Sequence, residues 1–200
     1  KELSKQGFDI FVNLCEGYPE WEVPGVDVVF CMESLNLPFT GPSTKLYDVP
    51  KELMKYIAYC EGITTPGFVL VNEMKDLDEA LRHLQFPLFV KPAHAGDSLG
   101  VDEHSLVHTK EELFDKTASI IKEYAPLLVE EYIAGREFTA LVAGNPDGKS
   151  CTVFRPVEYL FPKGKEFKTY SLKTSELHPE CNFPCTDEAI NKKLRFAAEK

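Results

Sequence analysis

The hydrophobic and polar positions of the chain follow two patterns that alternate along its length. Short apolar runs, typical of buried strands, are interspersed with longer segments in which apolar residues recur every three or four positions, as in helices with one buried face. The apolar runs predict strands over residues 8–14, 68–71, 88–90, 99–101, 127–133, 138–143 and 151–157. The helical spacing predicts helices over residues 26–35, 48–60, 76–84, 109–124 and 186–200. This mixture predicts an α/β fold.

The stretch FPLFVKPAHAGDSLGV, residues 86–101, is the clearest candidate for chemistry. Its first apolar strand ends in Lys91, and a loop with Gly96, Asp97 and Ser98 follows before the apolar pattern resumes. Glycine and small polar residues let several backbone amides point at one anion, and a lysine adds a point charge beside them. The arrangement suits a nucleotide phosphate. The alternative is an ordinary hairpin with a solvated Lys91.

Charged residues mark two further segments. The apolar run LLVEEYI, residues 127–133, contains two adjacent glutamates. Because a buried carboxylate needs a partner, we expect one of them to face a ligand or a lysine. In the predicted helix 48–60, Lys51 and Lys55 are four residues apart and therefore share a face, which would also be expected of a merely solvated basic stripe.

The segment FPKGKEFKTYSLKT, residues 161–174, reverses the charge of an otherwise acidic chain. Its lysines are Lys163, Lys165, Lys168 and Lys173. Such a local basic cluster favours an anionic ligand. A flexible, solvated loop is the alternative.

Composition excludes several classes of partner. The 200 residues are enough for one sizeable core or two small domains. With 32 acidic against 22 basic residues, the net charge is -10, so nucleic acid and anionic membranes are not expected partners. No apolar run reaches the length of a membrane span. Because the chain opens on Lys1 within a pattern, we expect it to be part of a longer protein.

The six cysteines do not form the spacing of a dense disulfide framework, which favours a reducing, cytoplasmic location. They are Cys15, Cys31, Cys60, Cys151, Cys181 and Cys185. His178, Cys181 and Cys185 could supply three zinc ligands, but no second convincing pair accompanies them.

The order of these segments resembles the ATP-grasp superfamily, and within it the D-alanine–D-alanine ligase-like branch, truncated at both ends. FVKPAHAGDSLGV is similar to the phosphate loop of that family, and LVEEYIAGREFT to its nucleotide-edge strand. The resemblance implies two lobes that clasp a nucleotide, in an α+β arrangement of the grasp type. It also implies a remnant of a Rossmann-like domain over residues 1–42, a small grasp lobe over 43–130 and an incomplete second lobe over 131–200.

The resemblance also implies a role for each matching residue. Lys51 and Lys91 would face the phosphates, and the loop of Gly96 and Ser98 would close over them. Glu130 would lie at the adenine, with the Ile133 backbone at the ring edge. The set expected to bind ATP is Lys51, Lys91, Gly96, Ser98, Glu130, Ile133, Glu137 and Lys173.

Catalysis would then proceed in two steps. A carboxylate attacks the γ-phosphate of ATP to give an acyl phosphate, and an amine displaces phosphate from it. Lys173 and Ser98 are the expected catalytic residues, and Glu137 would accept from the ribose hydroxyls. Glu20 would face the ammonium group of the substrate.

Two positions depart from the family pattern, and one short motif matches it only in its letters. Pro50 precedes Lys51 where the family has aspartate, and Asp97 stands where serine is common. Glu180-Cys181-Asn182 reads Glu-x-Asn, the family's metal motif, but it lies too close to Lys173 and among prolines. We therefore expect no metal ligand within this chain, and Mg²⁺ ligands beyond Lys200.

These residues leave three hypotheses. The leading one is an ATP-dependent carboxylate–amine ligase acting on an amino acid or small peptide, with ATP and Mg²⁺ as cofactors. The second is a catalytically incomplete ATP-binding module or pseudo-enzyme fragment. The third is a structural α/β interaction domain with solvated lysines. The expected partners are small molecules, and formation of a homodimer is left open.

Overall fold

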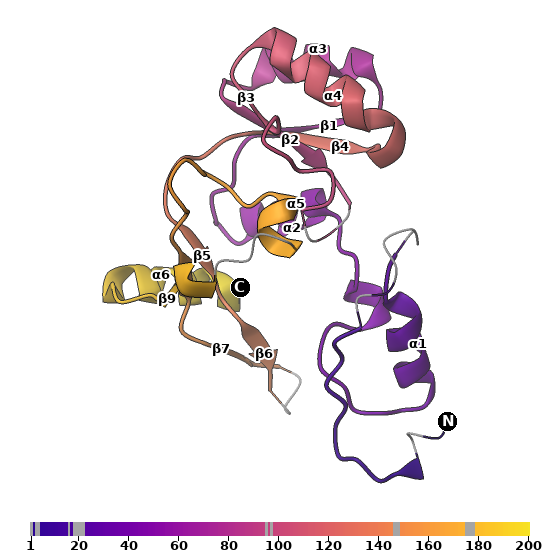
Figure 1. Cartoon of the computed structure of the whole chain (residues 1–200). Coiled ribbons are helices and arrows are strands. Elements are labelled where there is room, and N and C mark those ends of the chain that lie inside the picture. The colour runs from indigo at the N-terminus through magenta and orange to yellow at the C-terminus, as the bar shows by residue number, and fades with distance from the viewer. Residues whose placement is uncertain are drawn as a thin grey trace. The chain divides into compact units, whose positions relative to one another are not determined.

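The computed structural model describes residues 2, 5–15, 17, 23–94, 96, 98–145, 149–174 and 179–200 (Figure 1). They divide into two compact units. One comprises Lys1–Pro50 with His94–Gly96, and the other Lys51–Ala93 with Asp97–Lys200. The expected boundaries near residues 42 and 130 stay a prediction. None of the helices in these ranges is long and apolar enough to cross a membrane.

The first unit contains the helix α1 (Val26–Ser34) and a short 3-10 helix, η2 (Thr44–Leu46). The predicted strand over residues 8–14 is wrong: only Phe11 pairs, in an isolated parallel bridge to Phe39. Ile10, Val12 and Leu14 are exposed, so the apolar run has no buried face that would hold a longer strand. The Rossmann-like remnant stays a prediction.

The second unit contains a four-stranded antiparallel sheet, called the central sheet below (Figure 1). Its strands, in spatial order, are β1 (Phe68–Val71), β4 (Leu127–Glu131), β2 (Leu88–Pro92) and β3 (Leu106–Val107). Glu130 of β4 lies opposite Phe68 on one side and Phe89 on the other. The helix α2 (Lys51–Cys60) precedes this sheet.

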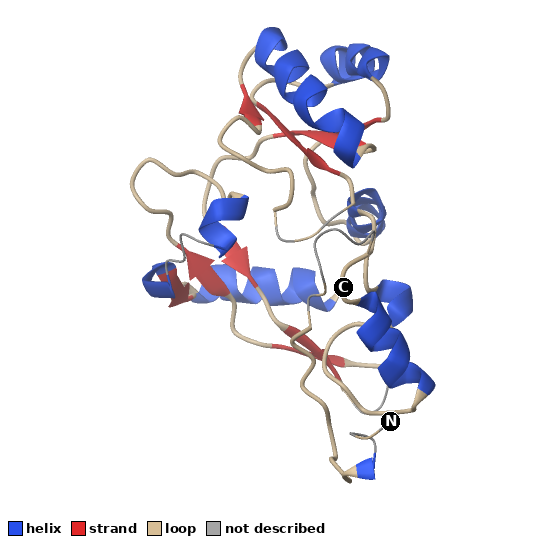
Figure 2. Cartoon of the chain, turned by 45° about the vertical axis from the view of Figure 1, so that its right-hand side comes forward, coloured by secondary structure: helices blue, strands red, loops and turns tan. Residues whose placement is uncertain are grey.

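Two helices cover one face of the sheet. Figures 1 and 2 both show α3 (Leu77–His83) and α4 (Lys110–Tyr124) on the same side of the strands. The buried core between these layers consists of Val69, Val71, Leu77, Ala80, Leu88, Val90, Val107, Leu113, Ile120, Leu127 and Val129. Because side chains alternate along a strand, the intervening residues Phe89, Lys91 and Glu130 belong to the opposite face.

The rest of the second unit is built from short strands. The strands β5 (Glu137–Thr139), β8 (Val157–Tyr159) and β9 (Asn182–Pro184) form a three-stranded sheet, while β6 (Val142–Gly144) pairs with β7 (Cys151–Val153). The predicted hairpin of 138–143 with 151–157 is therefore confirmed, although it is divided between two sheets. Figure 2 shows these strands near the long helix α6 (Glu188–Glu199). The remaining elements are η3 (Met74–Asp76), α5 (Tyr170–Thr174) and η4 (Pro179–Cys181).

The predicted strand over residues 99–101 is also wrong. The chain turns here, with left-handed backbone at Ser98 (φ 60°) and Gly100 (φ 72°), and the partner of β2 begins only at Leu106. Left-handed residues cannot continue an extended strand, so the apolar character of Leu99 and Val101 was misleading.

Candidate functional site

A buried carboxylate with two lysine partners lies on the face of the central sheet that α3 and α4 leave uncovered. Glu130 Oε2 lies 2.7 Å from Lys55 Nζ, and its other oxygen, Oε1, accepts a hydrogen bond from Lys91 Nζ. The side chains of Glu130 and Lys55 are each 11% exposed, and that of Lys91 is 24% exposed. The prediction that a glutamate of this strand needs a partner is confirmed, and the partners are lysines.

The electrostatics of Glu130 follow from this geometry. Burial raises the pKa of the Glu130 carboxyl, but the charges and hydrogen bonds of Lys91 and Lys55 together outweigh burial. The net effect is a pKa below the ordinary glutamate value of 4.5. Glu130 is therefore ionised at neutral pH, and the three side chains carry a formal charge of about +1.

Lys55 was not among the predicted site residues. Besides Glu130, its ammonium donates to the Pro66 carbonyl oxygen at 3.1 Å and lies 5.2 Å from the centroid of the Phe68 ring. The sequence could have pointed to Lys55 through its spacing of four residues from Lys51, which puts both lysines on one face of α2. The sequence does not indicate that this face would meet Glu130.

Lys51 lies at the end of the strand that carries Lys91. Both its backbone amide and its Nζ lie 3.3 Å from the Ala93 carbonyl oxygen, just beyond β2. The structure thus attaches the first residue of α2 to the exit of β2. Lys51 therefore lies near the end of the strand whose Lys91 pairs with Glu130, and the phosphate-binding role of the two lysines stays a prediction.

The lysine-rich segment 161–174 lies against the same face of the sheet. The Ser98 hydroxyl donates to the Lys168 carbonyl at 3.2 Å, and the Tyr132 hydroxyl donates to the Glu166 carbonyl at 3.0 Å. The Phe167 ring meets Phe89 edge-on, with 4.9 Å between ring centroids. Because Phe89 shares its face with Lys91, the segment covers the side of the sheet where the lysines lie.

Two further contacts hold this segment, one on each side of Phe167 and Lys168. Lys165 pairs with Glu103, and the Tyr170 amide donates to the Val101 carbonyl at 3.2 Å. Both contacts reach the turn-rich stretch that follows β2. The segment is thus held by the predicted phosphate loop and its continuation.

Glu137, the predicted ribose partner, lies on β5 and pairs with the same loop. Its Oε1 is 3.0 Å from Lys168 Nζ, which also lies 4.2 Å from the centroid of the Tyr159 ring. Lys168 therefore contacts Ser98 through its carbonyl and Glu137 through its ammonium. Nothing in the sequence distinguishes Lys168 from the other lysines of the segment.

For the other predicted site residues, the part of the chain that the structure describes gives no contact with the cluster of Glu130, Lys55 and Lys91. Ile133 is 67% exposed, and its backbone amide has no hydrogen-bond partner within the described ranges. Lys173 is exposed on α5, where no ion pair joins it to another residue that the structure describes. Gly96 is exposed and belongs to the first unit. Asp97, Glu20 and His178 lie outside the described residues.

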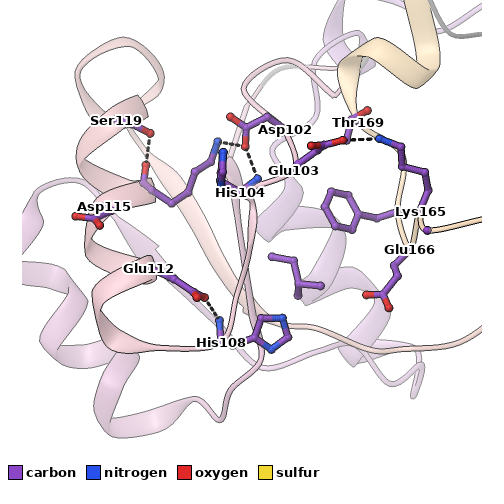
Figure 3. A pocket seen from close by; sticks show the side chains of 14 residues that line it. Asp102, Glu103, His104, His108, Glu112, Asp115, Ser119, Lys165, Glu166 and Thr169 are labelled. Atoms are coloured by element: carbon purple, nitrogen blue, oxygen red, sulfur yellow. Dashed lines mark hydrogen bonds and ion pairs between the residues drawn. The ribbon is translucent and has the colours of Figure 1, made fainter.

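A cavity of about 1020 Å³ lies beside α4, apart from the predicted nucleotide residues (Figure 3). Its lining is Asp102, Glu103, His104, Leu106, His108, Glu112, Asp115, Lys116, Ser119, Gly164, Lys165, Glu166, Phe167 and Thr169. Asp102 pairs with Lys116 at 2.9 Å, and Glu112 accepts from the His108 amide at 2.6 Å. Burial raises the pKa of Asp102, but Lys116 and the hydrogen bond from the His104 amide together lower it by more, so the net pKa is below the ordinary value. These carboxylates are thus occupied by internal contacts.

The family described as D-ala D-ala ligase C-terminus matches residues 60–200. A D-alanine–D-alanine ligase from Delftia acidovorans is 30% identical over 199 residues, which are 96% of this chain and 58% of the relative. One from Bacillus anthracis is 33% identical over 125 residues, 61% of this chain and 39% of the relative. The chain therefore spans about two fifths to three fifths of the curated relatives it matches.

Solved structures agree on the fold. VanG D-Ala:D-Ser ligase from Enterococcus faecalis superposes with a TM-score of 0.72 at 23% identity, covering 95% of this chain and 54% of that one. The D-alanine–D-alanine ligase of Bacillus anthracis complexed with ATP gives 0.65 at 22% identity, covering 98% and 60%. The predicted grasp-type α/β fold is confirmed by these neighbours. The match over residues 60–200 shows that the chain belongs to the family of D-Ala–D-Ala ligase C-terminal domains.

Proposed function

We propose that this chain is the nucleotide-binding part of an ATP-dependent carboxylate–amine ligase that acts on an amino acid or small peptide. The observation that carries the proposal is the pair of lysines, Lys55 and Lys91, on the two oxygens of buried Glu130. It places positive charge on the sheet face opposite α3 and α4, in a protein whose net charge is -10. A triphosphate is a ligand that such a face attracts.

The proposed binding mode distributes the nucleotide along this face. Lys51 and Lys91 face the phosphates, and the turn that carries Ser98 lies over them. The Ile133 amide, which has no hydrogen-bond partner among the residues that the structure describes, is available to an adenine ring edge next to Glu130. The ribose hydroxyls meet Glu137, which requires its present partner Lys168 to move aside.

The proposed reaction uses the charge of the lysines. The substrate carboxylate attacks the γ-phosphorus, the bond to ADP breaks, and an acyl phosphate forms. The amine then attacks the acyl carbon and releases inorganic phosphate and a proton. Lys91 and Lys173 stabilise the charge on the transferring group, and the segment 161–174 excludes water from the acyl phosphate.

Magnesium is expected in this family, but the described residues do not fit it. Within them, no group of three or more His, Cys, Asp or Glu side chains is arranged to hold a metal ion. No step is therefore assigned to a metal on this chain. A cytoplasmic location, a homodimer and Mg²⁺ ligands beyond Lys200 remain expectations of the proposal.

The test is binding of ATP to the 200-residue chain, measured by isothermal titration calorimetry. Replacing Lys91 with methionine removes a charge-assisted contact, which is worth about 1.5–3 kcal/mol, so affinity should fall about 10- to 100-fold. Lys122→Met on the exposed face of α4 is the matched control and should bind like the unchanged chain. Equal affinities for the two variants, or no ATP binding by the unchanged chain, would overturn the proposal.

Turnover is measured separately, on a protein that continues beyond Lys200, because the Mg²⁺ ligands are expected there and the 200-residue chain alone should release little phosphate. Release of phosphate from ATP should depend on an added amino acid, with D-alanine tried first because the relatives are named for it. ATP binding without such release would reduce the proposal to a binding module.

A further inference from the structure

We propose that Lys55 is a positioning residue that holds Glu130 in place and leaves Lys91 free to turn to the triphosphate. This inference rests on the proposed function, and it assigns a role to a residue outside the predicted nucleotide set. Its basis is the division of one carboxylate between two lysines, each on its own oxygen.

The two lysines differ in how firmly they are held. Lys55 Nζ contacts Glu130, the Pro66 carbonyl and the face of the Phe68 ring, and its side chain is only 11% exposed. Phe68 lies opposite Glu130 in the β1–β4 register, so two of the groups that contact the Lys55 ammonium come from paired positions of adjacent strands. Lys91 is 24% exposed and is therefore the lysine that can reach a ligand.

Charge explains why two lysines are needed. A single lysine on Glu130 would form a neutral pair, with little attraction for phosphate. The second lysine gives the cluster a formal charge of about +1. It also keeps Glu130 paired when Lys91 turns to the nucleotide, since a buried carboxylate without a partner would cost several kcal/mol.

The experiment is a charge-rescue cycle, read out as the dissociation constant for ATP on the 200-residue chain in calorimetry with Mg²⁺ in the buffer. Lys55→Met neutralises the cluster and should weaken binding by about tenfold or more. Adding Glu130→Gln to Lys55→Met restores the charge of +1, and glutamine keeps a side-chain oxygen at the position that would face the adenine, so this double variant should recover most of the affinity. Lys55→Arg, which keeps the charge, should stay within a few-fold of the unchanged chain.

The outcomes separate this inference from the proposed function. If the Lys55→Met variant has the same dissociation constant for ATP as the unchanged chain, the positioning role alone is overturned. A double variant as weak as Lys55→Met would mean that Lys55 only supports the fold, and would also overturn it. Failure of the unchanged chain to bind ATP would overturn the proposed function and this inference together. If Lys55→Met does not fold, affinity of the double variant near that of the unchanged chain supports the inference, and loss of binding overturns it.

The loss caused by Lys55→Met should also shrink as salt is raised from about 0.05 to 0.5 M, because screening weakens electrostatic attraction. A loss that is independent of salt would contradict the charge argument.

Discussion

The hydroxyl of Ser98 donates to the carbonyl oxygen of Lys168, 3.2 Å away and 70 residues further along the chain. Ser98 adopts a left-handed backbone conformation, with φ of 60°, in the turn that follows β2. The bond therefore joins the predicted phosphate loop to the lysine-rich segment 161–174. Since Lys168 also pairs with Glu137 at 3.0 Å, the segment connects this turn to the three-stranded sheet.

Replacing Ser98 with alanine should loosen the segment 161–174. A neutral hydrogen bond contributes about 1 kcal/mol, which corresponds to about a fivefold larger population of the opened segment. Opening exposes Lys163, Lys165 and Lys168 to trypsin. We therefore expect cleavage in this segment to be about five times faster, measured by mass spectrometry of limited digests.

Ser119→Ala is the matched control, because the Ser119 hydroxyl donates to the Lys116 carbonyl within α4, at 2.7 Å. Its loss should leave cleavage of the segment unchanged. Equal cleavage of the Ser98→Ala variant and the unchanged chain would show that the contacts of Tyr132 and Lys165 suffice to hold the segment closed.

Local sequence signals predicted several features around the four-stranded sheet. The pattern Thr109-Lys-Glu-Glu112 predicted a helix start, and Thr109 does accept from the Glu112 amide at 3.2 Å. Likewise, glutamates in an apolar strand predicted a buried carboxylate with a partner. These features depend on neighbours within a few residues or on burial, and periodicity reveals both.

Features that depend on distant segments were not predictable in the same way. The pairing of Lys55 with Glu130 joins residues 75 positions apart, and nothing near Lys55 in the sequence indicates it. Ser98 was predicted in a loop, but the continuation of the turn to Gly100 was missed because Leu99 and Val101 are apolar. The hydrophobic pattern of a sequence indicates which residues are buried. The Lys55–Glu130 pair and the turn at Gly100 depend instead on tertiary contacts.

Gly100→Ala should destabilise the protein. Gly100 has φ of +72°, and an added Cβ would lie 2.8 Å from Pro92 Cγ. The left-handed conformation costs about 1–2 kcal/mol and the overpacking about 1–3 kcal/mol, so the free energy of unfolding should fall by about 2–5 kcal/mol. Urea denaturation followed by circular dichroism measures the change.

Gly135→Ala serves as the control, because its added Cβ would meet nothing within 4 Å and its φ lies outside the left-handed region. The free energy of unfolding should change by less than about 1 kcal/mol. Two variants of equal stability would contradict the close approach of Gly100 to Pro92.

Glu130 should make the stability of the chain depend on pH in the acid range. Burial raises the pKa of the Glu130 carboxyl, but the two lysines lower it by a larger amount. The pKa in the folded chain is therefore below 4.5, whereas the carboxyl titrates near 4.5 in the unfolded chain. The unfolded state then binds more protons, and the stability that Glu130 contributes is complete above pH 4.5 and is lost as pH falls through the folded pKa. In urea titrations of the unchanged chain and Glu130→Gln, the difference in free energy of unfolding should be constant between about pH 5.5 and 7 and narrow below about 4.5. All other carboxylates titrate in both proteins, so the narrowing reports Glu130. A difference that stays constant or widens down to about pH 3.5 would contradict a Glu130 carboxylate held ionised between Lys55 and Lys91.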